Sequence, residues 1–293
     1  MTTLQETRIE FPCFGGRVSV LATDGDVERV RARLEQWHDR LTRFDPASEL
    51  SLLNAHPSET VRVSPVMACF VAAAVDAAHR TEGLVDPTLA PEIEVAGYVA
   101  DLDAPVELEP PVRVRPARPH PDRRWLAVRV DPATRTVTRP PGTRLDSGGI
   151  AKGLFADLAA GLLEAAGAYA IDCCGDVRIG GRDGIARAVR VDDPFEPGAW
   201  LHEYAVVSGG VATSGIGRRS WIGPDGARMH HLLDPSTGRP AYTGIIQVTA
   251  LGATAADAEV RAKAALLSGA ERASGWLPHG GLIVFDDGSH LVL

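Results

Sequence analysis

The sequence predicts an α+β fold in which helices pack on mixed and antiparallel sheets. Strand-like segments alternate apolar and polar residues, as in residues 125–130 and 136–139, or form short apolar runs such as residues 168–173. Helix-like segments repeat apolar residues every three to four positions, as in residues 24–43. Both patterns recur along the chain, and this mixed content predicts the fold class.

Length and composition limit the class of protein. A chain of 293 residues with 45% hydrophobic residues can bury a large core as one big domain or two modest ones. The net charge of −8 argues against a nucleic-acid partner. The cysteines lack metal-binding spacing and are predicted to be buried thiols. The N-terminus lacks a signal-peptide pattern and no apolar run reaches about 18 residues, which predicts a cytoplasmic protein without a membrane partner.

The first predicted elements are a hairpin and three helices. Residues 8–22 predict two strands around a Gly-Gly pair, and residues 24–43 predict a helix. Ser48 is typical of an N-cap and begins a short helix, after which residues 65–82 predict a longer one.

The next segment connects these helices to the centre of the chain. Asp86-Pro87-Thr88 is a turn sequence. Residues 92–122 are weakly patterned and predict an exposed, variable loop. The two strands at residues 125–130 and 136–139 follow, around an Asp-Pro-Ala-Thr turn.

The chemically most informative stretch follows these strands. It contains the run Asp146-Ser147-Gly148-Gly149-Ile150-Ala151-Lys152-Gly153, before an amphipathic helix that is predicted to end at Gly167. Glycines before a helix let the backbone approach a ligand, and the N–H groups of the first turn together with Lys152 favour a phosphate. The alternative is an ordinary strand-turn-helix connection with a solvated lysine. A cation in a first turn needs an anion nearby, and Asp146 is a candidate for it.

The C-terminal half contains further strands and one long helix. Strands are predicted at residues 186–191, 203–207 and 245–251, a helix at residues 255–269, and a closing hairpin at residues 280–293.

Two polar segments lie between these elements. Thr213-Ser214-Gly215 resembles a turn, and the two arginines that follow it favour a phosphate contact. His230 and His231 end a strand before an Asp-Pro turn. Because adjacent side chains on a strand face opposite ways, one histidine is expected at a site and the other in the core, and we favour His231 for the site.

The central run resembles the signature of the ApbE family, the FAD:protein FMN transferases. The family pattern is roughly Asp-x-Gly-Gly-x-Ala-Lys-Gly-aromatic-Ala-x-Asp, and residues 146–157 match it with the aromatic residue, Phe155, one place later. Other family blocks occur in order along nearly the whole chain, at residues 44–54, 85–91, 212–215 and 231–240.

This resemblance implies an architecture beyond the local pattern. It is a T-fold-related, two-lobed fold with a ligand cleft between the lobes. Residues 1–293 would then be a single domain, with possible lobes at about residues 1–140 and 141–293.

The resemblance also implies an activity. Enzymes of this family transfer FMN from FAD to a threonine or serine hydroxyl of a target flavoprotein and release AMP, with Mg²⁺ at the FAD pyrophosphate. The expected ligands are FAD, as the substrate, and Mg²⁺, and the expected protein partner is a flavoprotein that carries the acceptor hydroxyl.

The site residues that the resemblance carries over fall into three sets. Contacts to FAD are expected from Phe14, Asp86, Pro87, Thr88, Asp146, Lys152, Thr213, Ser214 and His231. The cation would be held by backbone carbonyls at Gly149 and Ala151 and by Glu259, and the catalytic residues would be His231, Glu259 and Lys263. Three of the FAD contacts have structural alternatives, since Phe14 suits a hairpin core and Asp86 and Thr88 suit a turn.

Lys263 departs from the family pattern. Glu259 takes the position of an aspartate and Lys263 that of a metal-binding threonine, four residues apart on one helix face. A protonated lysine has no lone pair and cannot ligate a hard cation. It either pairs with Glu259 as a salt bridge or supplies the positive charge that a metal would bring. Three functions therefore stay open: the transferase, a flavin-binding protein without transfer, and a Mg²⁺-dependent FAD pyrophosphatase.

Overall fold

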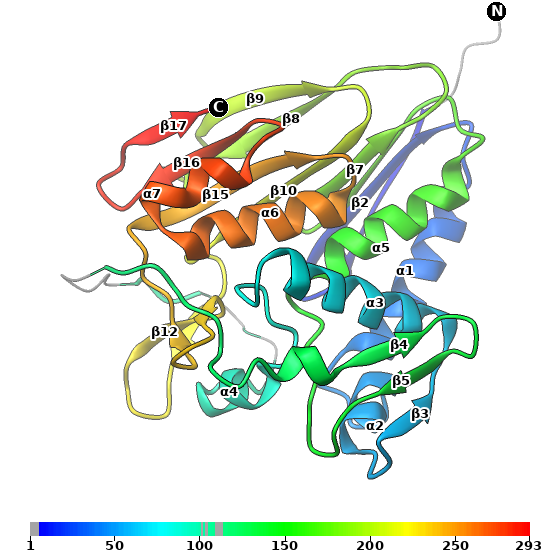
Figure 1. Ribbon diagram of the computed structural model, residues 1–293. Helices are drawn as coiled ribbons and strands as arrows, with labels where there is room; N and C mark the ends of the chain where they lie inside the picture. Colours follow the sequence, from blue (N-terminus) through cyan, green and yellow to red (C-terminus); the bar gives the residue numbers. More distant parts are fainter. Residues whose placement is uncertain (1–5, 101, 103–104, 109–113) are drawn as a thin grey trace, which may run out of the picture.

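The computed structural model describes residues 6–100, 102, 105–108 and 114–293, so part of the predicted variable loop lies outside the described residues. The chain forms a large antiparallel sheet with helices on one face and a strand hairpin on the other (Figure 1). This architecture confirms the predicted α+β class.

The large sheet has eight strands, and every neighbouring pair in it is antiparallel. In spatial order they are β1 (Glu6–Cys13), β2 (Gly16–Thr23), β6 (Tyr169–Cys173), β7 (Asp176–Gly180), β10 (Gly209–Gly215), β15 (Ile245–Gly252), β16 (Gly281–Phe285) and β17 (His290–Val292). The sheet therefore contains strands from both halves of the chain. A lobe boundary near residue 140 stays a prediction.

Two tight hairpins lie next to each other in this sheet. Phe14 and Gly15 join β1 to β2 with φ values of 57° and 65°, and Cys174 and Gly175 join β6 to β7 with φ values of 60° and 95°. Positive φ at both turn residues is the geometry that matches the twist of paired strands. A Cβ on Gly16 would lie 2.9 Å from Sγ of Cys174, so this cysteine fills the space beside the first hairpin.

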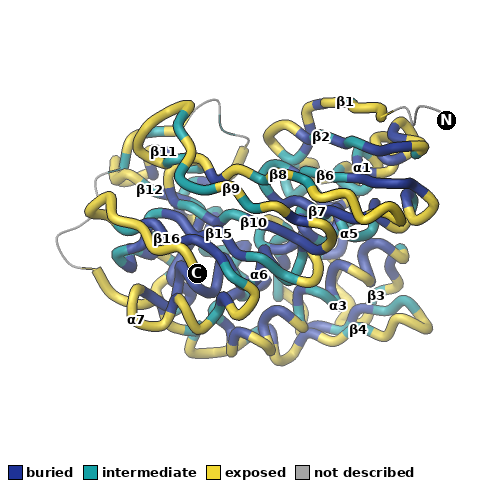
Figure 2. Tube along the Cα trace, turned by 90° about the horizontal axis from the view of Figure 1, so that it is seen from above, coloured by how far each residue is buried: buried dark blue, intermediate teal, exposed yellow. Residues whose placement is uncertain are grey.

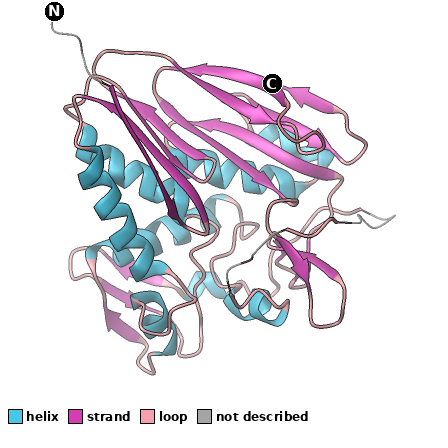
Figure 3. Ribbon diagram, turned by 180° about the vertical axis from the view of Figure 1, so that it is seen from behind, coloured by secondary structure: helices cyan, strands magenta, loops and turns pink. Residues whose placement is uncertain are grey.

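Three helices cover one face of the sheet, and they are α1 (Val27–Leu41), α5 (Ala151–Ala160) and α6 (Ala255–Ser268) (Figure 1). α6 packs on β10 and β15. The hairpin of β8 (Arg187–Asp192) and β9 (Trp200–Val206) covers the opposite face (Figure 3). Val206 packs there with Val177 and Val211. Figure 2 shows buried residues along β7, β10 and β15, between the two layers.

A second layer packs beneath these helices. It contains α2 (Glu49–Ala55), α3 (Pro65–Arg80) and a three-stranded sheet of β3 (Thr60–Arg62), β5 (Thr136–Thr138) and β4 (Arg129–Asp131). Ser48 and Ser64 cap the two helices, because their hydroxyls accept hydrogen bonds from N–H groups of the first turns. α3 contacts both α1 and α5, which joins the two layers.

The remaining elements are short and lie in the connections between these layers. They are α4 (Ala90–Val95), η1 (Arg124–Ala127), η2 (Gly161–Leu163), β11 (Ser220–Ile222), β12 (Arg228–His230), β13 (Leu233–Asp234), β14 (Arg239–Pro240), α7 (Ala270–Ala273) and η3 (Ser274–Trp276).

Several predicted elements differ from the structure in type or length. The predicted exposed loop at residues 92–122 begins within helix α4 and buries Ile93 and Tyr98. Residues 125–127 belong to the 3₁₀ helix η1 instead of a strand, because the chain turns there to bury the Trp125 ring against His79. The central helix ends at Ala160 instead of Gly167, since Gly161 begins a tighter 3₁₀ turn. The predicted turn around Thr213 is instead the central strand β10.

Candidate active site

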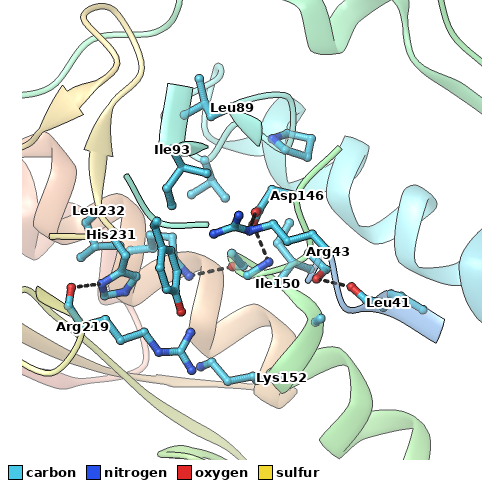
Figure 4. Close-up of a pocket in the computed structure, with 18 of the residues that line it drawn as sticks. Leu41, Arg43, Leu89, Ile93, Asp146, Ile150, Lys152, Arg219, His231 and Leu232 are labelled. Carbon is cyan, nitrogen blue, oxygen red and sulfur yellow. Dashed lines mark hydrogen bonds and ion pairs between the residues drawn. The ribbon is translucent and has the colours of Figure 1, made fainter. Parts of the chain in front are cut away.

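A pocket opens where the ends of α1, α5 and α6 meet the loops around residues 86, 146 and 231 (Figure 4). Its cavity volume is about 160 Å³. Aromatic and aliphatic side chains form much of the wall, including Phe14, Phe44, Leu89, Ile93, Tyr98, Phe155 and Leu232. The ionisable side chains that face the pocket are His38, Arg43, Asp86, Asp146, Lys152, Arg219, His231 and Lys263.

Asp146 is paired with Arg43 and not with Lys152, so the expected pairing within the signature is wrong. Its Oδ2 lies 2.9 Å from Nε of Arg43, and its Oδ1 accepts a 2.7 Å hydrogen bond from the Gly148 N–H. The side chain folds back over its own turn, as aspartates in turns commonly do. Asp146 thereby connects the Gly148-Gly149 loop to Arg43 at the edge of the pocket.

Arg43 is a pocket residue that the sequence did not indicate. Its guanidinium lies over the rings of Phe44 and Tyr98, with 4.4 Å and 4.7 Å to the ring centroids. Tyr98 in turn stacks on Trp221, with ring centroids 5.0 Å apart. Cation–π contacts of this kind stabilise a planar wall. In the sequence, the neighbours of Arg43 do not distinguish it from a surface arginine. Its contacts with Tyr98 and Asp146 exist only in the folded protein.

A group of four alternating charges lies at the inner side of the pocket, and we call this group of Lys152, Asp176, Glu259 and Lys263 the charge cluster. The Lys152 ammonium bonds to the Asp176 carboxylate and lies 3.5 Å from Oε1 of Glu259. The Lys263 ammonium lies 3.4 Å from the same Oε1. Asp176 and Glu259 are each only 1% exposed, so these charges depend on one another and not on water.

The pKa values of the charge cluster follow from burial and pairing. Burial opposes the charged form of Lys152, but attraction to Asp176 and Glu259 outweighs it and raises the pKa of this lysine. Burial by itself would raise the pKa of Glu259, but attraction to Lys152 and Lys263 outweighs this effect and lowers the pKa of this carboxyl. Burial and the neighbouring Glu259 raise the pKa of Asp176 to about 7. Lys152 and Glu259 are therefore charged at neutral pH.

The signature holds the two helices α5 and α6 close together. A Cβ on Gly153 would lie 2.7 Å from the backbone of Ala255, so only glycine permits this approach. The Gly153 N–H donates to Oε2 of Glu259 at 2.9 Å. The last residue of the signature, Asp157, accepts hydrogen bonds of 2.9 Å from the N–H groups of Ala255 and Ala256, and so caps α6.

The two adjacent histidines lie in different environments, as the strand argument predicts. His230 is 0% exposed and its ring packs edge-on against Tyr242. His231 lines the pocket, where its Nδ1 lies 3.4 Å from the Arg219 carbonyl oxygen (Figure 4). Because a carbonyl only accepts, this contact suits the tautomer with the proton on Nδ1, which places the lone pair on Nε2. Burial, followed by the nearby Arg219, lowers the pKa of His231 well below its usual value, which keeps the ring neutral.

Arg219 is a second pocket residue that was not among the predicted site residues. One guanidinium nitrogen donates to the Phe14 carbonyl oxygen at 2.9 Å, and within the described parts of the chain no carboxylate pairs with it. Its side chain lies beside Lys152 on one side of the pocket, opposite Leu89 and Ile93 (Figure 4). The only signal in the sequence was its position after the Thr-Ser-Gly segment, which Arg218 shares. Arg218 instead pairs with Asp192 at the surface.

The fold brings most of the predicted FAD contacts to this pocket. Phe14, Asp86, Pro87, Asp146, Lys152 and His231 line it, as do Gly149, Ala151 and Lys263. Glu259 lies behind Lys152 and Lys263.

Thr88, Thr213 and Ser214 do not line the pocket. Thr88 is buried and bonds to Oδ1 of Asp86, which makes it a support of the turn. Thr213 shares its sheet face with Val211, which packs under the β8–β9 hairpin, and its hydroxyl pairs with Thr249 at 2.8 Å. Ser214 faces the helices but is buried in β10.

The residues around Lys263 do not fit a Mg²⁺ ion held as the resemblance implies. The ammonium donates a 2.7 Å hydrogen bond to the Gly149 carbonyl oxygen, and it pairs with Glu259. Two of the expected metal ligands are therefore already bonded to a cation. Among the residues that the structure describes, no cluster of three or more histidine, cysteine or acidic side chains is arranged to hold a metal. The described helices also include none long and apolar enough to cross a membrane.

Comparison with known proteins gives sequence relatives over most of the chain. FAD:protein FMN transferases of Vibrio cholerae and Treponema pallidum are 28% and 29% identical over 254 and 269 residues. These matches cover 82% and 84% of this chain, and 72% of each relative.

Solved structures share the fold. The ApbE protein of Thermotoga maritima superposes with a TM-score of 0.80 at 26% identity, over 98% of this chain and 97% of that one. The flavin transferase ApbE of Vibrio cholerae superposes with a TM-score of 0.72 at 22% identity, over 99% and 97%. The sequence profile described as the ApbE family matches residues 6–284. This chain belongs to the ApbE family.

Proposed function

We propose that this protein is an FAD:protein FMN transferase, which moves FMN from FAD to a threonine or serine hydroxyl of a target flavoprotein and releases AMP. The observation that carries the proposal is the composition of the pocket. An aromatic wall that includes Phe14, Tyr98 and Phe155 suits planar rings, and a cationic end with Arg219 and Lys263 suits a diphosphate. FAD has both parts, and the relatives at 28% and 29% identity are named for this reaction.

The reaction exchanges one phosphorus–oxygen bond for another. The acceptor hydroxyl oxygen bonds to the phosphorus of the FMN half, the bond from this phosphorus to the bridging oxygen breaks, and AMP leaves with that oxygen. The hydroxyl proton goes to a base. Neutral His231, with its lone pair on Nε2, has the protonation state that this step requires.

The remaining charged residues position the substrate. Arg219 has donors available for phosphate oxygens, and Lys263 presents a fixed positive charge at the Gly149 loop. Glu259 pairs with this ammonium from behind, and Lys152, which is itself bonded to Asp176, pairs with the same Glu259 carboxylate. Transfer of a phosphoryl group depends mainly on such positioning and charge stabilisation.

The test combines the purified protein with FAD and a flavoprotein domain that carries an acceptor threonine. We expect AMP release together with an FMN-sized mass increase on the acceptor. A control acceptor with this threonine changed to valine should give neither product. Equal AMP release with and without acceptor would instead indicate the pyrophosphatase, and tight FAD binding without AMP would indicate a flavin-binding protein.

A further inference from the structure

Lysine is rare in this chain and occurs at one place in the structure. The sequence contains only two lysines, Lys152 and Lys263, although it has 30 lysines and arginines together. Both lysines belong to the charge cluster and both face the same carboxylate oxygen of Glu259. Elsewhere the chain uses arginine for its ion pairs with carboxylates, for example Arg43 with Asp146 and Arg144 with Glu94. A lysine ammonium is therefore confined to this one place in the protein.

The Lys263 ammonium lies between oxygen atoms of two different segments. The side chain is 11% exposed and its ammonium bonds to one carbonyl oxygen and one carboxylate oxygen, from the Gly149 loop and from Glu259. A loop carbonyl and an acidic side chain are oxygen donors of the kind that hard cations take. The third donor direction of an ammonium stays available to an oxygen of a ligand in the pocket, which Lys263 lines.

The positive and negative charges of the charge cluster are equal in number. Two lysines face two carboxylates, and these four buried charges sum to zero when all are ionised. A divalent cation at Glu259 and Gly149 would have to displace the Lys263 ammonium. If it lay beside this ammonium instead, it would repel both lysines at short range. Ammonium and metal therefore exclude each other at this position.

We infer that Lys263 is a built-in monovalent cation that stands in place of a divalent metal, so that this protein binds the diphosphate of FAD without Mg²⁺. This inference rests on the proposed function for the identity of the ligand. Lys263 acts here as a binding residue that touches the substrate, and Glu259 and the Gly149 carbonyl fix the direction in which its ammonium points.

The main experiment measures FAD affinity by equilibrium titration, in excess EDTA and in millimolar MgCl₂, for three proteins. The wild type should bind FAD equally under both conditions. Lys263→Thr, which introduces an oxygen ligand, should bind about tenfold more weakly in EDTA and should regain affinity with Mg²⁺. In Lys263→Met the methionine side chain is similar in length to lysine but has neither a charge nor an oxygen ligand, so this variant should bind FAD weakly under both conditions. Circular dichroism spectra and cooperative thermal unfolding check that the variants are folded, since loss of the Lys263 ammonium from its buried pair with Glu259 is expected to lower the melting temperature.

A second measurement observes the lysine side chains directly. Because the chain has only two lysines, protein labelled with ¹³C at the lysine Cε carbons gives two side-chain signals, and Lys263→Met assigns them. Addition of MgCl₂ should leave both signals unchanged, whereas FAD should shift that of Lys263. In the Lys263→Thr protein, Mn²⁺ should broaden the remaining Lys152 signal, since a metal at Glu259 lies close to it.

Two results would overturn the inference. One is a wild-type protein whose FAD affinity falls severalfold in EDTA and whose lysine signals shift with Mg²⁺. The other is a folded Lys263→Met protein that binds FAD as tightly as the wild type. Both results are independent of turnover, so a protein that binds FAD but fails to transfer FMN would count against the proposed function and not against this inference.

Discussion

The ammonium of Lys263 on α6 and the carbonyl oxygen of Gly149 before α5 are joined by a 2.7 Å hydrogen bond. This bond connects residues far apart in the sequence. Glu259 adds a second connection, because its carboxylate accepts hydrogen bonds from the Gly153 N–H on α5 and from the Lys263 ammonium on α6. The loop and the two helices therefore share one set of buried charges.

Removing the carboxylate of Glu259 should strongly destabilise the fold. Glu259→Ala leaves two buried ammoniums with one acidic partner fewer, and loss of one partner from a buried ion pair costs about 3–5 kcal/mol. Urea denaturation measures the change in the free energy of unfolding. Glu271→Ala, at an exposed position of α7, is the control and should change it by less than about 0.5 kcal/mol.

Arg219 should contribute to FAD affinity and its neighbour Arg218 should not. Arg219→Met removes donors that face the pocket, and charge-assisted hydrogen bonds of about 1.5–3 kcal/mol predict about 10- to 100-fold weaker binding. Arg218→Met removes only a surface ion pair with Asp192. Fluorescence titration with FAD compares the two variants, and equal losses in both would contradict the assignment of Arg219 to the pocket.

His231→Gln should reduce the rate of transfer more than the binding of FAD. Loss of a general base reduces turnover by about 10²- to 10⁴-fold, while the pocket wall is largely kept. Single-turnover kinetics with saturating FAD separate the two effects. His279→Gln, an exposed substitution, is the control. If FAD affinity falls as far as the rate does, His231 binds substrate and is not the base.

Stability should fall when the pH is lowered below about 6.5, because of the buried His230 and the partly buried His231. Burial lowers the pKa of His230 to about 3, and it also lowers that of His231. Between the unfolded and folded pKa values, the unfolded chain binds protons that the folded protein does not, so lower pH favours unfolding by up to about 1.4 kcal/mol per pH unit for each histidine.

His230→Phe tests this pH dependence. Neither ring nitrogen of His230 has a hydrogen-bond partner among the described residues, so the apolar ring should be tolerated at neutral pH. Urea denaturation between about pH 5 and pH 7 should show a shallower slope for His230→Phe than for the wild type. A slope equal to that of the wild type would mean that His230 is protonated in the folded protein.

Two glycines of the same helix region should respond in opposite ways to alanine. At Gly153 a Cβ would lie 2.7 Å from the Ala255 backbone, so Gly153→Ala should destabilise the protein by about 1–3 kcal/mol and disturb the Glu259 contact. A Cβ added at Gly161 would meet no atom of the described residues within 4 Å, so Gly161→Ala should be neutral or stabilising. Thermal melting of both variants checks the difference.

Local pattern and motif were sufficient for much of the fold. Alternation, apolar runs and helical spacing predicted β1, β2, β6, β15, α1, α3 and α6, because the signal comes from which side of each element is buried. The signature predicted the turn before α5 and the position of Lys152. Pattern failed at Trp125 and near Gly161, where local geometry responds to a single buried ring or a single glycine.

The sequence by itself determined most of the elements, the family and nine of the residues that line the pocket, because these depend on residue type and spacing along the chain. Only the tertiary structure decided which side chains pair with one another and which ones face the pocket. It paired Asp146 with Arg43 and Lys152 with Asp176, turned Thr213 to the opposite face of the sheet, and brought Arg219 to the pocket. Charge pairing depends on distances of a few ångströms between elements far apart in the chain, and residue spacing does not contain those distances.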